Sequence, residues 1–422
     1  MTSNPAAPCA VLVDAYSTGN FLPAAFARLG VAVVHVQSTP EPMTSMLLPE
    51  LAAYRGNVVH TGDLAATVER LRAYRPIAVL AGQEPGVPLA DALSEQLGLA
   101  TNGSRQSSAR RDKYRMIETL RAAGIRCARQ HRSADPAELV AWAEAEGRYP
   151  VVVKPLSSAS TDGVVICRDA AEVAAAAAQV LASRDIFDLP NTEALIQSYL
   201  AGTEYIVDTV SANGARFVCG VWEYEKNAVT GGKRVYDKDI LLHQDESPVP
   251  ELVSYVDEVL AALGIRHGAA HAEVIMTDDG PALVEIGARL NGDMNPGFHD
   301  VCLGANQADL VALAYARPGE FAERYAGRVY TKLRSAMVHN TRTERDGVVT
   351  GVDQAAVDKI ASLPTVHLVS VKLNPGKRIR PTIDLLSSPL RIFLTGDDPD
   401  QLRADHGVIQ GLKDEVYQVA PA

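Results

Sequence analysis

The chain has 422 residues, 47% hydrophobic and 22% charged, a composition typical of a water-soluble globular protein with room for about three domains. Its 51 acidic and 40 basic residues give a net charge of −11, which argues against a general nucleic-acid binder. The five scattered cysteines lack zinc spacing, no signal peptide is evident, and no segment approaches the roughly 20 apolar residues of a membrane span, so a cytoplasmic protein with reduced thiols and no membrane partner is expected.

Residues 1–100 alternate strand and helix patterns. Strands are predicted at 9–14, 31–36 and 76–81, and helices at 21–29, 64–74 and 87–97. This alternation predicts a doubly wound parallel sheet. Residues 16–20 follow the first strand, where such sheets bind ligands, but they lack G-x-G-x-x-G. A plain strand-to-helix turn is therefore favoured over a dinucleotide site.

The next segment combines two lysines with a small polar loop. A helix is predicted from 111 to 123, strands at 151–155 and 164–166, and a second helix at 171–181. Lys113 begins the first helix, Lys154 ends a strand, and the loop 156–163 contains Ser157, Ser160, Thr161, Asp162 and Gly163. Backbone amides, hydroxyls and lysine ammonium groups suit phosphates. Each lysine taken singly is more often a surface residue, and the loop is not a Walker loop.

Two predicted strands, 194–200 and 205–210, enclose the connection 201–204. A strand that leaves a sheet can pair its backbone with an adenine edge, and Glu204 could accept from ribose hydroxyls. From this segment alone an ordinary strand–turn–strand connection is favoured. Residues 226–247 are predicted to form an irregular polar loop, and 226–243 is long enough to be either a lid or a surface loop.

Two carboxylates, Glu273 and Glu285, are predicted to face each other across a hairpin that follows a helix at 251–263. If 278–280 form a three-residue loop, residue 277 pairs with 281, and Glu273 lies opposite Glu285 with Cβ atoms about 5 Å apart. His271, Gly287 and Arg289 share that face. Such a pair needs a cation, and Mg²⁺ prefers oxygen ligands. A two-residue turn would instead put the glutamates on opposite faces, as an acidic hairpin edge.

The last hundred residues carry weaker signals. Strands are predicted at 329–332, 366–372 and 390–395, and a helix at 399–406 that ends at Gly407. The basic stretch 372–380 is most simply a solvated turn.

In combination, these features resemble the ATP-grasp superfamily over roughly residues 100–310. The motifs that carry the resemblance are Val-Lys-Pro at 153–155, His-Ala-Glu at 271–273 and Val-Glu-Ile-Gly-Ala-Arg at 284–289. The pattern is most similar to the L-amino acid ligase branch, whose members join two amino acids, or an acid and an amine, at the expense of ATP. The resemblance implies an amide bond of the dipeptide type. The resemblance implies an α/β ATP-grasp fold of two α+β lobes after a doubly wound domain. The implied divisions are 1–100, 101–190 with the phosphate loop, 191–320 with the nucleotide and metal lobe, and 321–422.

The resemblance also implies a role for each matching residue. Lys113 and Lys154 would contact the α- and β-phosphates of ATP, and the 157–163 loop would cover the γ-phosphate. Gln197, Tyr199 and Leu200 would line the adenine pocket, with Glu204 on the ribose. Glu273 and Glu285 would hold Mg²⁺, and Arg289 would bind the transferred phosphate and the substrate carboxylate.

One position departs from the superfamily. Many members carry Glu-x-Asn, whose Asn is a second metal ligand, and this chain has Gly287 there. A small residue is typical of the L-amino acid ligase branch, and Asn291 is a candidate to compensate. His271 is a candidate base, although a hydrogen bond to the adjacent strand is favoured. Asp293 is a candidate contact for the amine, with a solvated loop aspartate as the alternative.

The resemblance implies an acyl-phosphate mechanism that releases ADP and phosphate. Its partners would be a small-molecule carboxylate and an amine, and a homodimer stays open. One alternative is another ATP-grasp activity of the carboxylase or purine-pathway type, but no biotin-carrier motif is visible. The other is a non-catalytic ATP-binding protein, against which the co-occurrence of Lys154, Glu273, Glu285 and Arg289 argues.

Overall fold

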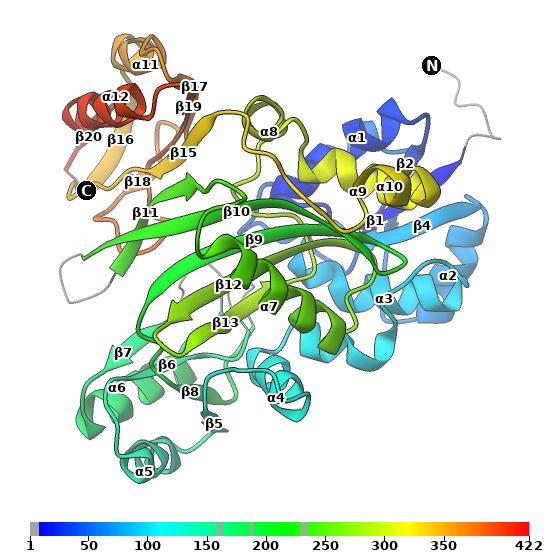
Figure 1. Cartoon of the computed structure of the whole chain (residues 1–422), viewed down its shortest axis with the longest axis horizontal. Coiled ribbons are helices and arrows are strands. Elements are labelled where there is room, and N and C mark those ends of the chain that lie inside the picture. The colour runs from blue at the N-terminus through cyan, green and yellow to red at the C-terminus, as the bar shows by residue number, and fades with distance from the viewer. Residues whose placement is uncertain (1–7, 158–162, 186–188, 229–233, 422) are drawn as a thin grey trace.

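The computed structural model describes residues 8–157, 163–185, 189–228 and 234–421. Four sheets organise the chain (Figure 1): a parallel N-terminal sheet, a small sheet covered by α5 and α6, a long central sheet, and a small C-terminal sheet beside α11 and α12. None of the helices in the described ranges is long and apolar enough to cross a bilayer.

The N-terminal unit is the predicted doubly wound parallel sheet, with strand order β3-β2-β1-β4. Its elements are β1 (Cys9–Val13), α1 (Leu22–Arg28), β2 (Ala32–Gln37), β3 (Asn57–Val59), α2 (Leu64–Arg72), β4 (Pro76–Ala81) and α3 (Val87–Gln96). Successive residues of β1 pack into two different cores, Ala10 and Leu12 in one and Val11 and Val13 in the other. Burial on both faces explains the unbroken apolar run in this strand.

The second unit positions Lys154. It contains α4 (Lys113–Ala122), β5 (Gln130–Ser133), α5 (Pro136–Glu146), β6 (Val151–Pro155), β7 (Val165–Cys167), α6 (Ala170–Leu181) and β8 (Ala194–Ser198). The sheet order is β5-β8-β6-β7, so β8 lies between two strands that precede it in the chain. The expected division at residue 190 therefore does not coincide with the end of this sheet.

The central sheet has the order β13-β12-β9-β10-β11-β15-β19-β17, with β14 paired to β10. Its first strands and their helices are β9 (Thr203–Ala212), β10 (Ala215–Ala228), β11 (Arg234–Leu241), α7 (Val249–Ala262), β12 (Gly268–Thr277), β13 (Gly280–Gly287), α8 (Pro296–Leu303), α9 (Gln307–Ala316) and α10 (Pro318–Tyr325). Helices α7 and α9 pack on β9 and β12. The opposite face of these strands carries the charged side chains of the candidate site.

The predicted irregular loop at 226–247 is wrong for residues 226–228 and 234–241, which belong to the antiparallel pair β10 and β11, and is confirmed for residues 242–247. Lys226 pairs with Tyr236 and Tyr224 pairs with Asp239. Tyr224, Lys226 and Tyr236 line the large cavity. Asp237 and Asp239 of β11 are buried although they are charged residues. Strand periodicity is therefore hidden by charges on both faces. Residues 229–233, the centre of the predicted lid, lie outside the described residues.

The C-terminal region extends the central sheet and adds a small one, with order β18-β16-β20. Its elements are β14 (Arg328–Val329), β15 (Ser335–Asn340), β16 (Gly347–Val352), α11 (Gln354–Ala361), β17 (Val366–Val371), β18 (Arg378–Ile379), β19 (Leu390–Gly396), α12 (Pro399–Leu412) and β20 (Tyr417–Ala420). The predicted strand at 329–332 is reduced to β14. The predicted stop at Gly407 is wrong, because α12 continues through Gly407 to Leu412. Ile409, beyond the glycine, is buried in the C-terminal core. A glycine inside a helix costs only about 1 kcal/mol.

The predicted hairpin exists, but its turn differs from the prediction. Thr277 pairs with Gly280, so the loop has two residues instead of three. Between the pairs Val274–Leu283 and Glu273–Glu285, β13 has one extra residue, Val284, and this bulge shifts the pairing by one residue. Beyond the bulge Glu273 lies opposite Glu285, and His271 lies opposite Gly287. Two deviations from the assumed geometry thus cancel, and the two glutamates share one face.

Candidate active site

A cavity of about 1110 Å³ lies where the N-terminal unit, the small sheet and the central sheet meet. It is lined by the following predicted site residues: Lys113, Lys154, Gln197, Tyr199, Leu200, Glu204, His271, Glu273, Glu285, Arg289, Asn291 and Asp293. Ser157 and Gly163 do not line it, and Ser160, Thr161 and Asp162 lie outside the described residues. Single-ligand pockets usually span about 300–1,000 Å³. The cavity can therefore hold a nucleotide together with a second small molecule.

Two facing glutamates and a lysine form the charged centre of the cavity. Glu273 and Glu285 are cross-strand neighbours, and the Lys113 ammonium at the start of α4 forms an ion pair with Glu285. Burial and the charge of Glu285 raise the pKa of the Glu273 carboxyl. Burial alone would lower the pKa of Lys113, but Glu285 and Glu84 outweigh it and raise that pKa. The pair therefore draws positive charge toward itself, as expected of a cation site.

Lys154 lies on β6 and is buried, with 6% of its surface exposed. Burial and the neighbouring Lys113 lower the pKa of Lys154 to about 8. Nearby, Gly163 has φ +66°, and a Cβ atom there would lie 2.8 Å from the Pro155 ring. Glycine is thus required where the loop returns to the sheet.

The side of the cavity for which adenine and ribose contacts were predicted is formed by β8 and the start of β9. The Gln197 amide donates to Gln130 Oε1 at 2.8 Å, so this side chain is held within the small sheet. Glu204 forms an ion pair with Lys226 and accepts from the Tyr236 hydroxyl at 3.1 Å. A ribose that bound Glu204 would have to share this carboxylate with both partners.

His271 makes the hydrogen bond that was favoured for it. Its Nδ1 lies 2.8 Å from Asp208 Oδ1 on the adjacent strand β9. Burial would lower the pKa of His271, but Asp208 raises it to about 9. Asn291 donates to the other Asp208 oxygen at 2.7 Å, and its own Oδ1 accepts from the Asp293 amide at 2.8 Å. Both ends of the Asn291 amide are engaged, so the structure does not support it as a replacement for the ligand missing at Gly287.

Sequence reasoning missed Glu84, which the N-terminal unit contributes to the cavity. Its carboxylate lies 2.8 Å from Arg111 Nη1 and 3.5 Å from Arg289 Nη2. Burial would raise the pKa of Glu84, but Arg111, Arg289 and Lys113 lower it to about 2. Glu84 thereby holds the Arg289 guanidinium at the wall of the cavity. The available signal was its position just after β4, at the carboxyl edge of a parallel sheet.

Two more cavity residues had open or different predictions: Asp293 was a candidate contact for the amine, with a solvated loop aspartate as the alternative, and Lys372 was placed in a solvated turn. Asp293 forms an ion pair with Arg391 of β19, whose Nε donates to Asn340 at 3.1 Å, so it is not a solvated loop aspartate. Lys372, assigned to a solvated turn, lines the cavity. The other basic residues of that stretch, Lys377, Arg378 and Arg380, are exposed. These neighbours are brought together by strand pairing across long sequence separations, which no local pattern indicates.

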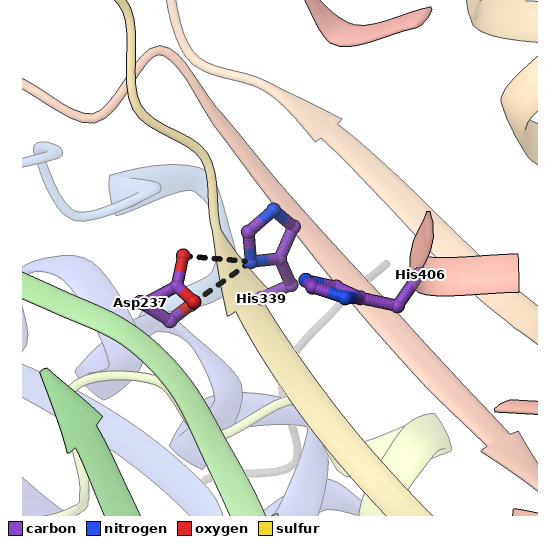
Figure 2. A group of neighbouring side chains, drawn as sticks. All are labelled: Asp237, His339 and His406. Carbon is purple, nitrogen blue, oxygen red and sulfur yellow. Dashed lines mark hydrogen bonds and ion pairs between the residues drawn. The ribbon is translucent and has the colours of Figure 1, made fainter. Parts of the chain in front are cut away.

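A separate cluster of Asp237, His339 and His406 joins β11, β15 and α12 (Figure 2). The three could hold a metal ion by spacing, but hydrogen bonds already use both ring nitrogens of His339 and Nε2 of His406. His339 Nδ1 donates to the Asp237 backbone carbonyl at 2.9 Å. The Gln410 amide donates to Nε2 of His339 at 2.8 Å and of His406 at 3.1 Å. We interpret this cluster as a polar tie between α12 and the sheet.

This interpretation predicts that Gln410→Leu lowers the free energy of unfolding by about 1–3 kcal/mol, because buried His339 Nε2 loses its donor. Urea unfolding measures the effect, and Gln418→Leu at an exposed position of β20 is the matched control. A rise in the melting temperature of the wild-type protein on adding Zn²⁺ would instead indicate a metal site.

Comparison with known proteins places these features in context. The family model for the ATP-grasp domain matches residues 147–296. Dapdiamide A synthase of Enterobacter agglomerans is 35% identical over 414 residues, which cover 97% of this chain and 96% of that protein. The L-amino acid ligase structure from Bacillus licheniformis superimposes with a TM-score of 0.75 at 20% identity, covering 98% of this chain and 99% of that one. N5-carboxyaminoimidazole synthetase from Staphylococcus aureus, complexed with ADP, gives 0.69 at 14% identity, covering 95% and 96%.

Proposed function

This chain belongs to the ATP-grasp superfamily, in the L-amino acid ligase branch, and we propose that it joins an amino acid carboxylate to an amine with conversion of ATP to ADP and phosphate. The observation that carries the proposal is the Glu273–Glu285 pair in one cavity with Lys154 and Arg289. The relationship to dapdiamide A synthase over nearly the whole of both chains favours amide formation. The purine-pathway alternative rests on structures that share the fold at 14% identity.

The donor set of the glutamate pair fits Mg²⁺. Two half-buried carboxylates on one face supply hard oxygen ligands, and Lys113 already brings a positive charge to Glu285. We assign Glu273 and Glu285 as the residues that hold the ion. When bound, Mg²⁺ would neutralise the charge that develops on the phosphate oxygens.

The proposed reaction has two steps. A carboxylate oxygen of the first substrate attacks the γ-phosphorus of ATP, the bond to the β,γ-bridging oxygen breaks, and ADP leaves. The amine nitrogen of the second substrate then attacks the acyl carbon of the acyl phosphate. The carbon–oxygen bond to phosphate breaks, inorganic phosphate leaves, and the nitrogen loses a proton. In both steps the protein contributes mainly by positioning the reacting groups and stabilising charge, and it forms no covalent bond to the substrates.

The residues of the cavity divide this work. Lys113 and Lys154 supply positive charge for the phosphates, with Tyr199 and Leu200 beside the adenine and Glu204 near the ribose. Arg289 offers a planar fork to the reacting carboxylate, and Glu84 fixes its orientation. His271, held by Asp208, keeps Glu273 in place through a 3.6 Å contact of Nε2 with its Oε1.

Purified protein incubated with ATP, Mg²⁺ and pooled amino acids should release ADP and phosphate only when both a carboxylate and an amine substrate are present. Mass spectrometry of the pool should show a condensation product. Release of AMP and pyrophosphate would contradict the acyl-phosphate route. ATP binding without turnover in any pool would favour a non-catalytic role.

A further inference from the structure

Arg111 is a largely buried cation to which the proposed mechanism gives no role. It lies between a short 3-10 helix, η4 (Ser104–Arg110), and the start of α4. Its Nη1 lies 2.8 Å from Glu84 Oε1 of the N-terminal unit, and its Nη2 donates to Ser157 Oγ at 3.2 Å. Ser157 begins the loop for which γ-phosphate contacts were predicted. Arg111 therefore bridges a carboxylate of the cavity wall and the start of that loop, which belong to different units of the fold.

The backbone on each side of Arg111 is anchored. Before it, the fully buried Arg110 donates from Nη1 to the Leu263 carbonyl at 2.9 Å. After it, the Lys113 amide donates to the Leu156 carbonyl at 3.1 Å. A side chain that leaves a fixed backbone can hold its partners accurately. The Arg111 guanidinium is thus suited to fixing the relative positions of the two groups that it contacts.

Glu84 divides its two oxygens between two arginines. Oε1 faces Arg111, and Oε2 lies 3.5 Å from Arg289 Nη2. Arg289 is confined elsewhere too, because its Nη1 donates to the Leu290 carbonyl at 3.0 Å and a Cβ atom on Gly287 would lie 3.1 Å from its Nε. Without Arg111, the Glu84 carboxylate would lose one of the two charged contacts that fix its orientation. Arg289 would then lose a fixed partner.

These contacts form a continuous chain from Ser157 to Arg289. Its two ends belong to the two partners of the first proposed step, the γ-phosphate of ATP and the attacking carboxylate. In-line attack needs both partners in one geometry, and a displacement of about 1 Å can cost a hundredfold in rate. We propose that Arg111 is a positioning residue that couples the binding of the carboxylate substrate to the binding of ATP. This inference rests on the proposed ligase function.

The coupling has a stated sign. Either ligand, bound alone, must immobilise the side chains between Ser157 and Arg289, and the second ligand then meets them already immobilised. Each ligand should therefore bind more tightly in the presence of the other, by the same factor. Burial would raise the pKa of Glu84, but Arg111 and then Arg289 lower it to about 2, so this link of the chain stays charged at neutral pH.

The test measures by calorimetry the Kd of AMP-PNP, a non-hydrolysable ATP analogue, in Mg²⁺ with and without a pool of carboxylates. The pool holds the twenty proteinogenic amino acids and their N-acetyl derivatives, and the derivatives offer a carboxylate without a free α-amine. We expect the pool to lower the wild-type Kd roughly fivefold or more, as is typical of coupled sites. Arg111→Met should lose this shift with the Kd for AMP-PNP alone unchanged, and Arg111→Lys, which keeps the charge, should retain part of it.

Further variants guard against a folding defect in Arg111→Met. Ser157→Ala removes a single hydroxyl at a half-buried position, leaves the pair of Arg111 with Glu84 intact, and should still lose most of the shift. Glu84→Gln should resemble Arg111→Met, and the double variant should be little worse than either, because both act through one contact. Arg115→Met, at an exposed position of α4, is the matched control and should shift as the wild type does.

Three results would overturn the assignment: no shift in the wild type, an unchanged shift in Arg111→Met, or weaker binding of AMP-PNP alone that accounts for the whole effect of Arg111→Met. Turnover with ATP and the same pool separates this failure from failure of the ligase proposal. A shift that Arg111→Met abolishes, with no condensation product from the wild type, would keep the coupling and contradict the ligase. A condensation product from the wild type, with an unchanged shift in Arg111→Met, would do the reverse.

Discussion

Glu285→Gln should fold normally and lose ligation by roughly a hundredfold to a thousandfold, the loss expected when a preorganised charge is removed from a phosphoryl-transfer site. The substitution keeps the size of the side chain and an oxygen that can accept from Lys113, but it removes the negative charge that faces Glu273. Lost attraction to Lys113 and relieved repulsion from Glu273 oppose each other, so little change in the melting temperature is expected. ADP release and circular dichroism measure the two effects.

The matched control is Glu258→Gln on the exposed side of α7, which should keep full activity. Because we assign both glutamates to one ion, Glu273→Gln should resemble Glu285→Gln, and the double variant should be little worse than either single one. Both single variants should also need more Mg²⁺ to reach half of their own maximal rate. Full activity in Glu285→Gln would contradict the metal assignment.

The hairpin shows what sequence patterns can and cannot predict. Alternating apolar residues correctly predicted two paired strands, and the facing of Glu273 and Glu285 is confirmed. The loop was wrong by one residue, because nothing in the sequence marks a bulge that compensates for a shorter turn. The predicted pairing of Glu273 with Glu285 is nevertheless correct, because the bulge restores the register at these two residues.

The parts that were missed depend on contacts between distant segments. Glu84 meets Arg289, and Asp293 meets Arg391, across long separations that only the assembled sheets define. Strand β11 escaped prediction because charged side chains on both of its faces hide the apolar alternation typical of a strand. Motif resemblance reached the residues that we propose for ATP, but it did not place Lys372 in the cavity.

Lys154→Met is expected to lose nucleotide binding while stabilising the protein without nucleotide. Lys154 has a pKa of about 8 in the folded protein, below its ordinary value of 10.5, so the folded state binds fewer protons than the unfolded state between these values. Its charge therefore opposes folding below about pH 8, and this penalty fades as the pH rises toward 10.5. Methionine removes the charge and keeps the length of the side chain, so the melting temperature at pH 7 should rise.

The positive charge of Lys154 that opposes folding is also the charge that we propose binds the phosphates of ATP. Lys154→Met should therefore raise the stability of the protein and lower its nucleotide binding. In the wild type, ATP at 100 times its Kd stabilises the folded state by about 2.7 kcal/mol, and thermal unfolding detects this as a shift in melting temperature. Lys154→Met should lose most of that shift and most of the turnover, whereas Lys377→Met should keep both. A variant that is less stable without ATP, yet shifts fully when ATP is added, would show that Lys154 serves the fold and not the phosphates.

The pH dependence sharpens the test: the stability gained by Lys154→Met over the wild type should be large at pH 7 and should disappear near pH 10.5, since only the protonated ammonium opposes folding.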